Sequence, residues 1–468
     1  MNAKKDVIIT KEYYQNCKNN EYNYNDYDEL LKNLKDEDQL IQFKGLIGIT
    51  KLCEEAKKAP DTSKGFLEIF PLLFIFIKNY PEEFKYEALN CLIIIEKINI
   101  ILKHSYIELS HKENKELIII MISFIVNYKN LKLNIFIPAL KYLAIISSND
   151  NNSKILLNYK VKDKILDILK YYQNDLYIIK KCIKSLQIIC NNKSVNQSYI
   201  KISEDVIEVL SNIFINYPDD IKINMCSLNL IITLTLNKNS NILDKIIDLN
   251  LLQKIIEFTN TDNNDLIFYS LKIIGNFAMN EDSKYTEKLL DNDIINILIK
   301  FIDKNYNEKI RKESSFTLSN IAAGTTGQIM KLYKSNIYPI LSDIIINESE
   351  SELKINCLWT LYNFTCIPYK EYLDEMIQKG LMKIIVDRFD IDKGNTLACS
   401  LEALEKLLKS KQNVNDPAAI DIAENEIINL NLFDALKSLK KKNNEEIVQS
   451  KIDILLRDYF GIADANSL

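Results

Sequence analysis

Two segments of the sequence each place an aromatic residue four positions before an asparagine. The pairs are Phe316 with Asn320 and Trp359 with Asn363, and the two asparagines are 43 residues apart. Residues at i and i+4 share one face of a helix, so the two members of each pair should project together. An aromatic ring can hold a cation on its face, and an asparagine amide can both donate and accept hydrogen bonds. The pairs are therefore candidates for a displayed surface.

Helices must present these pairs, because the apolar residues around them recur at helical spacing. The residues expected on the opposite, buried side are Leu318, Ile321, Cys357, Leu361 and Phe364. A single tryptophan at helical spacing is more often a core residue than a ligand platform. From the residues alone, a core position for Trp359 therefore stays open as the alternative.

The chain shows no constellation that could catalyse a reaction. It has no glycine-rich phosphate loop, and its histidines, His104 and His111, stand apart from the nine cysteines. No CxxC pair occurs, so free, buried thiols in a reducing compartment are the simplest interpretation. We expect a protein that is not an enzyme, with no cofactor and no metal.

Composition limits the partners and the compartment. Of the 468 residues, 47% are hydrophobic and 26% charged, and the net charge is −5 with both signs interleaved, which predicts no nucleic-acid binding. The longest apolar runs, such as Leu117 to Val126, fall far short of the ~20 residues that span a bilayer. The N-terminus has no apolar run typical of a signal peptide. These features predict a soluble intracellular protein without membrane contact.

A repeat becomes visible when the position of Asn320 and Asn363 is traced along the chain. The equivalent residues are Ile94, Ile145, Ile188, Ile231, Asn276 and Lys406. After a first interval of 51 residues, the spacing stays between 43 and 45 residues. This period is typical of armadillo and HEAT repeats, which stack into one continuous solenoid. We predict an all-α solenoid of about ten repeats over residues 27–460, a disordered polar lead over residues 1–26 and a short tail over residues 461–468.

Three segments resemble the armadillo repeats of importin-α, the adaptor that binds nuclear localisation signals. They are RKESSFTLSNIAAG, LWTLYNFT with its WxxxN pair, and the C-terminal NLFDALKSLKKKNNEEIVQSKIDILLRDYF. The resemblance implies a right-handed armadillo superhelix whose groove holds a basic peptide in extended form. It also implies a role in the cytoplasm and the nucleus, and contact with an export receptor at the last repeats.

The aromatic ladder departs from that family in the first half of the chain. The pairs expected in the family's major site are here Lys141 with Ile145, Lys184 with Ile188, and Ser227 with Ile231. Lysine repels a basic peptide and isoleucine offers no hydrogen bond, so this site should be lost. The eighth-repeat pair has also changed, to Glu402 and Lys406.

The family's minor site is better preserved, in a groove of about two repeats. Lys272 and Asn276 match the fifth repeat, and Glu313 matches an acidic residue three positions before the aromatic. The candidate peptide-binding residues are Phe316, Asn320, Trp359, Asn363, Asn276 and Glu313.

The N-terminal segment lacks the arginines with which the family recruits importin-β. Its basic residues are only Lys4, Lys5, Lys11 and Lys18, so we expect no importin-β binding through residues 1–26. Two functional hypotheses remain. The chain is either a divergent transport adaptor that binds basic cargo segments at the minor site, or an armadillo scaffold that binds another protein and no localisation signal.

Overall fold

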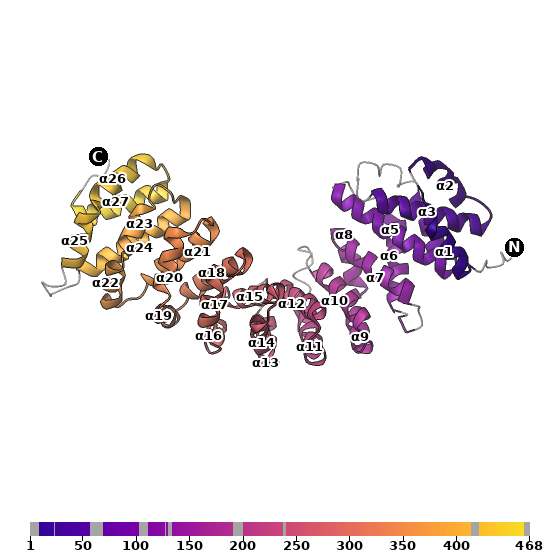
Figure 1. Cartoon of the computed structure of the whole chain (residues 1–468), viewed down its shortest axis with the longest axis horizontal. Helices are drawn as coiled ribbons and strands as arrows, with labels where there is room; N and C mark the ends of the chain where they lie inside the picture. Colours follow the sequence, from indigo (N-terminus) through magenta and orange to yellow (C-terminus); the bar gives the residue numbers. More distant parts are fainter. Residues whose placement is uncertain are drawn as a thin grey trace. The chain divides into compact units, whose positions relative to one another are not determined.

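The structure is a computed structural model and contains helices throughout. It describes residues 9–22, 24–56, 69–102, 111–126, 128–129, 133–190, 200–236, 240–412 and 421–462. No β-strand occurs in these ranges. The helices divide into two compact units, Met1–Leu251 and Leu252–Leu468. Figure 1 shows the helices in chain order within each unit.

The first unit contains α1 to α13. Their bounds are α1 Lys11–Asn19, α2 Tyr27–Leu34, α3 Gln39–Ala56, α4 Phe70–Asn79, α5 Glu82–Leu102, α6 His111–Val126, α7 Leu133–Ile146, α8 Asp150–Asn158, α9 Val161–Tyr171, α10 Leu176–Cys190, α11 Ile200–Asn216, α12 Ile221–Thr235 and α13 Ser240–Asp248. A short 3-10 helix, η1 Tyr24–Asp26, precedes α2. In this unit α3, α5, α7, α10 and α12 pack on one another in succession.

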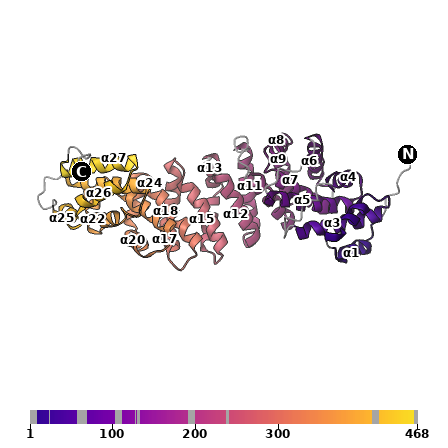
Figure 2. The ribbon, with the colours of Figure 1, turned by 90° about the horizontal axis from the view of Figure 1, so that it is seen from above.

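The second unit contains α15 to α27, after α14 Leu251–Glu257 and η4 Phe258–Asn260. The further bounds are α15 Asn264–Ala278, α16 Ser283–Leu290, α17 Ile294–Ile302, α18 Glu308–Ala322, α19 Thr326–Lys334, α20 Tyr338–Asn347, α21 Ser351–Phe364, α22 Lys370–Gln378, α23 Leu381–Asp387, α24 Gly394–Gln412, α25 Asp421–Asn429, α26 Leu432–Lys442 and α27 Glu446–Phe460. Here α15, α18, α21, α24 and α27 pack in succession, and the views of Figures 1 and 2 agree on this order for α15 and α18.

Each repeat in the second unit is built from three helices. A short helix is followed by a second helix and then by a longer third one, as in α16, α17 and α18, and the pattern recurs in α19 to α21 and in α22 to α24. Three helices per repeat of this length are the armadillo arrangement. The predicted all-α solenoid is confirmed.

A left-handed residue marks the turn between the first two helices of most repeats. The residues with positive φ at this place are Lys160, Asn250, Asp293, Asn336, Gly380 and Asn431. Asparagine, aspartate and glycine adopt this conformation more readily than other residues, which ends the first helix sharply. The turn lets the second helix fold back on the first, and it recurs at intervals of 43 or 44 residues from Asn250 to Gly380.

A helix forms where the sequence predicted a disordered lead. Residues 11–19 make α1, which packs on α3. Cys17 is buried, the Tyr13 hydroxyl donates to the Leu40 carbonyl at 2.8 Å, and the Tyr14 hydroxyl donates to the buried Glu87 on α5. The few apolar and aromatic side chains of this segment lie on one face of the helix, so the segment folds although its overall composition is polar. Residues 1–8 lie outside the described ranges.

The remaining expectations concern cysteines, membranes and the C-terminal tail. Five of the nine free cysteines are buried, three are half-buried and Cys366 is exposed. Across the described part of the chain, no helix is long and apolar enough to cross a membrane. The predicted tail lies outside the described residues from position 463 onward.

Candidate functional site

The two aromatic and asparagine pairs lie on neighbouring third helices of the second unit. Phe316 and Asn320 are on α18, and Trp359 and Asn363 are on α21, which packs directly on α18. All four residues are half-buried. The residues expected on the other side of these helices, Leu318, Ile321, Cys357, Leu361 and Phe364, are fully buried. The predicted division of faces is therefore present, and Trp359 is not enclosed in the core.

The Asn320 amide is partly engaged within its own helix. Its Nδ2 donates to the Phe316 carbonyl at 3.1 Å, which fixes the side chain close to the aromatic residue one turn earlier. Asn320 also lines a hollow of about 320 Å³ where α15 and α18 end and α19 begins. One amide hydrogen is thus committed, while the side chain borders open space.

Glu313 is held between α15 and α18 by an ion pair. Its Oε2 lies 2.9 Å from Lys272 Nζ, and its side chain is 12% exposed against 40% for that of Lys272. The close approach depends on Gly275, since a Cβ there would stand 3.1 Å from Glu313 Oε1 and from Thr317 Oγ1. A cation that binds Glu313 must therefore compete with Lys272.

Asn276 and Asn356 are less accessible than the pairs. Asn276, in the last turn of α15, is only 9% exposed, so little of its side chain reaches the surface on which the prediction placed it. Asn356 takes the position where the resemblance implies an acidic residue. Its Nδ2 donates to Ser315 Oγ at 3.0 Å and joins α21 to α18.

The eighth-repeat positions point to internal contacts. Glu402 on α24 pairs with Lys451 on α27. Lys406 Nζ lies 3.0 Å from Cys366 Sγ at the end of the preceding repeat. The row of aromatic and asparagine side chains therefore ends at α21.

Basic residues in the first turns of α18 are neutralised by several carboxylates. Lys312 Nζ lies 2.7 Å from Glu308, 3.0 Å from Glu350 and 3.2 Å from Glu352. Next to it, Arg311 pairs with Glu348 and donates from Nε to the Ile302 carbonyl at 3.1 Å. These contacts tie the start of α18 to the turn before α21.

The pair of Arg311 with Glu348 should make the stability of the second unit depend on acid pH. The hydrogen bond from Arg311 holds the pKa of Glu348 below its ordinary value of 4.5. A lowered folded-state pKa stabilises the fold above the unfolded value, and that contribution disappears as the pH falls through the folded-state value. We expect the urea concentration at the unfolding midpoint to decrease as the pH is lowered below 4.5. In the Arg311→Met variant this decrease should be smaller. Equal slopes for both proteins, measured by the fluorescence of the single tryptophan Trp359, would contradict this.

In the first unit, the predicted ladder positions agree with the structure on α7 and α10 but are wrong on α12. Lys184 and Ile188 on α10 are exposed, and Lys141 and Ile145 on α7 are half-buried, as a displayed ladder requires. Ser227 and Ile231 on α12, however, are fully buried.

The residues of α12 at the ladder positions are instead Asn229, which is half-buried, and Thr233, which is 8% exposed and so mostly covered, as Asn276 is. A Ser-Leu dipeptide in the sequence could have identified this register. It begins at Ser227 and again at Ser270, and both serines are fully buried. In that alignment Asn229 is equivalent to Lys272, and Thr233 is equivalent to Asn276. The ladder position of α12 still carries neither tryptophan nor the paired asparagine.

Comparisons with known proteins give a local sequence likeness and a likeness of fold. No protein-family model matches the chain. Over 110 residues, 23% of this chain, the sequence is 26% identical to the probable importin subunit alpha-A of Dictyostelium discoideum. The matched segment spans 20% of that protein.

Among solved structures, an engineered protein matches 92% of this chain and 98% of its own, with a TM-score of 0.70 and 15% identity. A designed armadillo repeat protein matches 52% of this chain and 98% of its own, with a TM-score of 0.44 and 19% identity. At 15% identity, the match to the engineered protein shows a shared fold and nothing more.

Proposed function

We propose that the chain is an importin-α-like adaptor whose second unit binds a basic segment of a cargo protein. The observation that carries the proposal is the placement of Phe316, Asn320, Trp359 and Asn363 on the accessible side of two packed helices. Local similarity to an importin α subunit supports it.

Each side chain has a defined part in this proposal. The rings of Trp359 and Phe316 accept the aliphatic stem and the cation of lysine or arginine. The amides of Asn363 and Asn320 pair with the peptide backbone, independently of its sequence. Glu313 exchanges Lys272 for a cation of the peptide, which adds selectivity for positive charge.

The wider role we propose is transport of cargo between the cytoplasm and the nucleus. The repeats that end in α27 would contact an export receptor, while residues 1–26 would not bind importin-β because they lack arginine. A direct assay in which importin-β bound the chain, and lost binding on deletion of residues 1–26, would contradict the second statement.

An armadillo scaffold for another protein partner is the second candidate. It is favoured by the internal use of the groove's polar groups, since Glu313 already pairs with Lys272 and Asn320 already donates to Phe316. A scaffold of this kind would not discriminate between basic and neutral peptides at α18 and α21.

Titration of a fluorescent Lys/Arg-rich peptide against the full chain tests the proposal. Trp359→Ala should weaken binding by ~1 to 2 kcal/mol, about five- to thirty-fold, because it removes a cation–π platform. Asn363→Ala should cost a comparable amount, since it leaves backbone groups of the peptide without a partner.

Two variants serve as controls. Tyr369→Ala removes an aromatic side chain that is 46% exposed and lies after α21, and it should leave the affinity unchanged. Lys184→Ala, in the first unit, should leave it unchanged or slightly improved. Equal losses at Lys184 and Trp359, or no binding by the unmodified chain, would exclude the adaptor and leave the scaffold.

A further inference from the structure

The first unit displays lysine where the second unit displays aromatic rings. On α7 the displayed pair is Lys141 and Ile145, and on α10 it is Lys184 and Ile188. The two members of each pair are four residues apart and share a helix face. With Lys181 on α10, we call these residues the Lys/Ile ladder.

The lysines of the ladder come from two helices that pack on each other, α7 and α10. Helix α7 packs between α5 and α10. Burial, followed by the charges of Lys181, Lys97 and Lys184, lowers the pKa of Lys141. Burial and the neighbouring ammonium groups both disfavour the charged form of Lys141, and a bound anion would favour it.

Few carboxylates offset that charge. Among the described residues, no carboxylate oxygen lies within 4.0 Å of the side-chain nitrogen of Lys141, Lys181 or Lys184. By contrast Lys180, one position earlier on α10, pairs with Asp220 at 3.0 Å. Within the described ranges, the lysine beside the ladder thus has an acidic partner, and the three lysines of the ladder have none.

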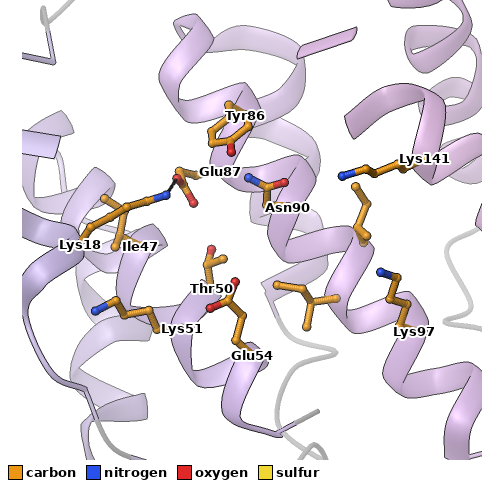
Figure 3. A pocket seen from close by; sticks show the side chains of 12 residues that line it. Lys18, Ile47, Thr50, Lys51, Glu54, Tyr86, Glu87, Asn90, Lys97 and Lys141 are labelled. Carbon is orange, nitrogen blue, oxygen red and sulfur yellow. Dashed lines mark ion pairs between the residues drawn. The ribbon is translucent and has the colours of Figure 1, made fainter. Parts of the chain in front are cut away.

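A cleft continues the ladder toward α5 and α3. It has a volume of about 640 Å³, and Asn90, Ile94, Lys97 and Lys141 line it from α5 and α7. Figure 3 shows Lys97 and Lys141 at the right of this cleft and Asn90 between them and the ion pair of Lys18 with Glu87, while Glu54 lies below. The same surface therefore offers cations, an amide and an apolar side chain.

We propose that the Lys/Ile ladder binds an extended acidic segment of a partner protein in which carboxylates alternate with aliphatic side chains. The lysines attract the carboxylates, and Ile188, which is 36% exposed, with Ile145 gives the aliphatic side chains an apolar contact. Asn90 and Asn229 supply amides on the helices at either side for the backbone of the segment.

The residues between the lysines favour a peptide over a nucleic acid. Single-stranded nucleic acid is usually held by aromatic rings on which bases stack, and the ladder carries isoleucines at those places. The net charge of −5 also gives no general attraction for nucleic acid.

Fluorescence anisotropy with the full chain tests the proposal. The probe is a short fluorescein-labelled peptide of alternating Glu and Leu, compared with the same peptide carrying Gln for Glu. The Glu peptide should bind more tightly, and added salt should weaken it. Lys141→Glu and Lys184→Glu should each weaken binding by about ten-fold, because each replaces attraction by repulsion.

Two control variants test whether binding depends on the ladder itself, and not on the overall charge or on the proposed peptide site of the second unit. Lys154→Glu changes an exposed lysine on α8 and should leave binding unchanged. Trp359→Ala should also leave it unchanged, so this test stands apart from the proposed adaptor function. If a glutamate variant fails to fold by circular dichroism, the doubly neutral Lys141→Gln and Lys184→Gln variant replaces it, with a smaller expected loss.

Three outcomes would overturn the proposal. They are equal affinity for the Glu and Gln peptides, full affinity in the Lys141 and Lys184 variants, and no binding by the unmodified chain. Displacement of the peptide by an equal charge concentration of polyuridylate, with the same dependence on Lys141 and Lys184, would assign the surface to nucleic acid instead.

Discussion

Phe364→Ala is expected to lower the free energy of unfolding of the second unit by about 3 to 5 kcal/mol. Phe364 ends α21 on its buried side and is fully enclosed. Its ring meets that of Tyr333 on α19 at 5.2 Å between centroids and at 88°. Alanine would remove this contact and leave a cavity that neighbouring helices cannot close without shifting.

The matched control is Phe316→Ala, because Phe316 is also a phenylalanine on a third helix but is only half-buried. Its removal should cost less, about 1 to 2 kcal/mol, since part of its surface already contacts water. Urea unfolding followed by Trp359 fluorescence reports on both variants, as Trp359 is the single tryptophan and lies in this unit. Equal losses would mean that the aromatic pairs belong to the core, and the proposed peptide site would lose its basis.

The sequence predicted the fold because the repeat is carried by buried apolar residues. Leu318 and Leu361, 43 residues apart, are both fully enclosed, and such positions tolerate little besides apolar side chains. Periodicity therefore persists there even where the displayed residues change from aromatic to lysine. The same reasoning separated the accessible from the buried faces of α18 and α21 correctly.

Two features of the fold escaped prediction for different physical reasons. Helix α1 is stabilised by tertiary contacts, of which the hydrogen bond from Tyr14 to the buried Glu87 joins residues 73 positions apart. Such a contact between distant residues produces no periodic pattern in the sequence from which it could be predicted. The register of α12 was misjudged because a step of 43 residues from Ile188 leads to the buried Ile231, whereas the equivalent position is Thr233, 45 residues after Ile188.

In the candidate site, the sequence identified the helix faces but could not anticipate pairings between helices. The ion pair of Lys272 with Glu313 depends on how closely α15 approaches α18, and Gly275 leaves room for Glu313 at this contact because glycine has no Cβ. The bond from Asn320 to Phe316 depends on a rotamer. Spacing along the chain determines neither.

The connection from α23 to α24 contains an ion pair whose rupture should be as costly as the loss of Phe364. Arg388 Nε donates to Asp392 Oδ1 at 3.0 Å and to Oδ2 at 3.1 Å, and an Nη2 donates as well. The side chains are 12% and 3% exposed. We expect Arg388→Ala to lower the free energy of unfolding by about 3 to 5 kcal/mol, because it leaves the carboxylate of Asp392 buried without this partner.

Lys383→Ala is the control, since Lys383 and Asp387 form an ion pair at the same i,i+4 spacing with side chains 61% and 58% exposed. It should cost no more than about 0.5 kcal/mol. The double variant Arg388→Ala with Asp392→Ala should lose less stability than the sum of the single variants, because the second change removes the unpaired charge. Additive losses in urea unfolding would show that the pair contributes through packing alone. A loss for Lys383→Ala as large as that for Arg388→Ala would show that burial does not set the cost.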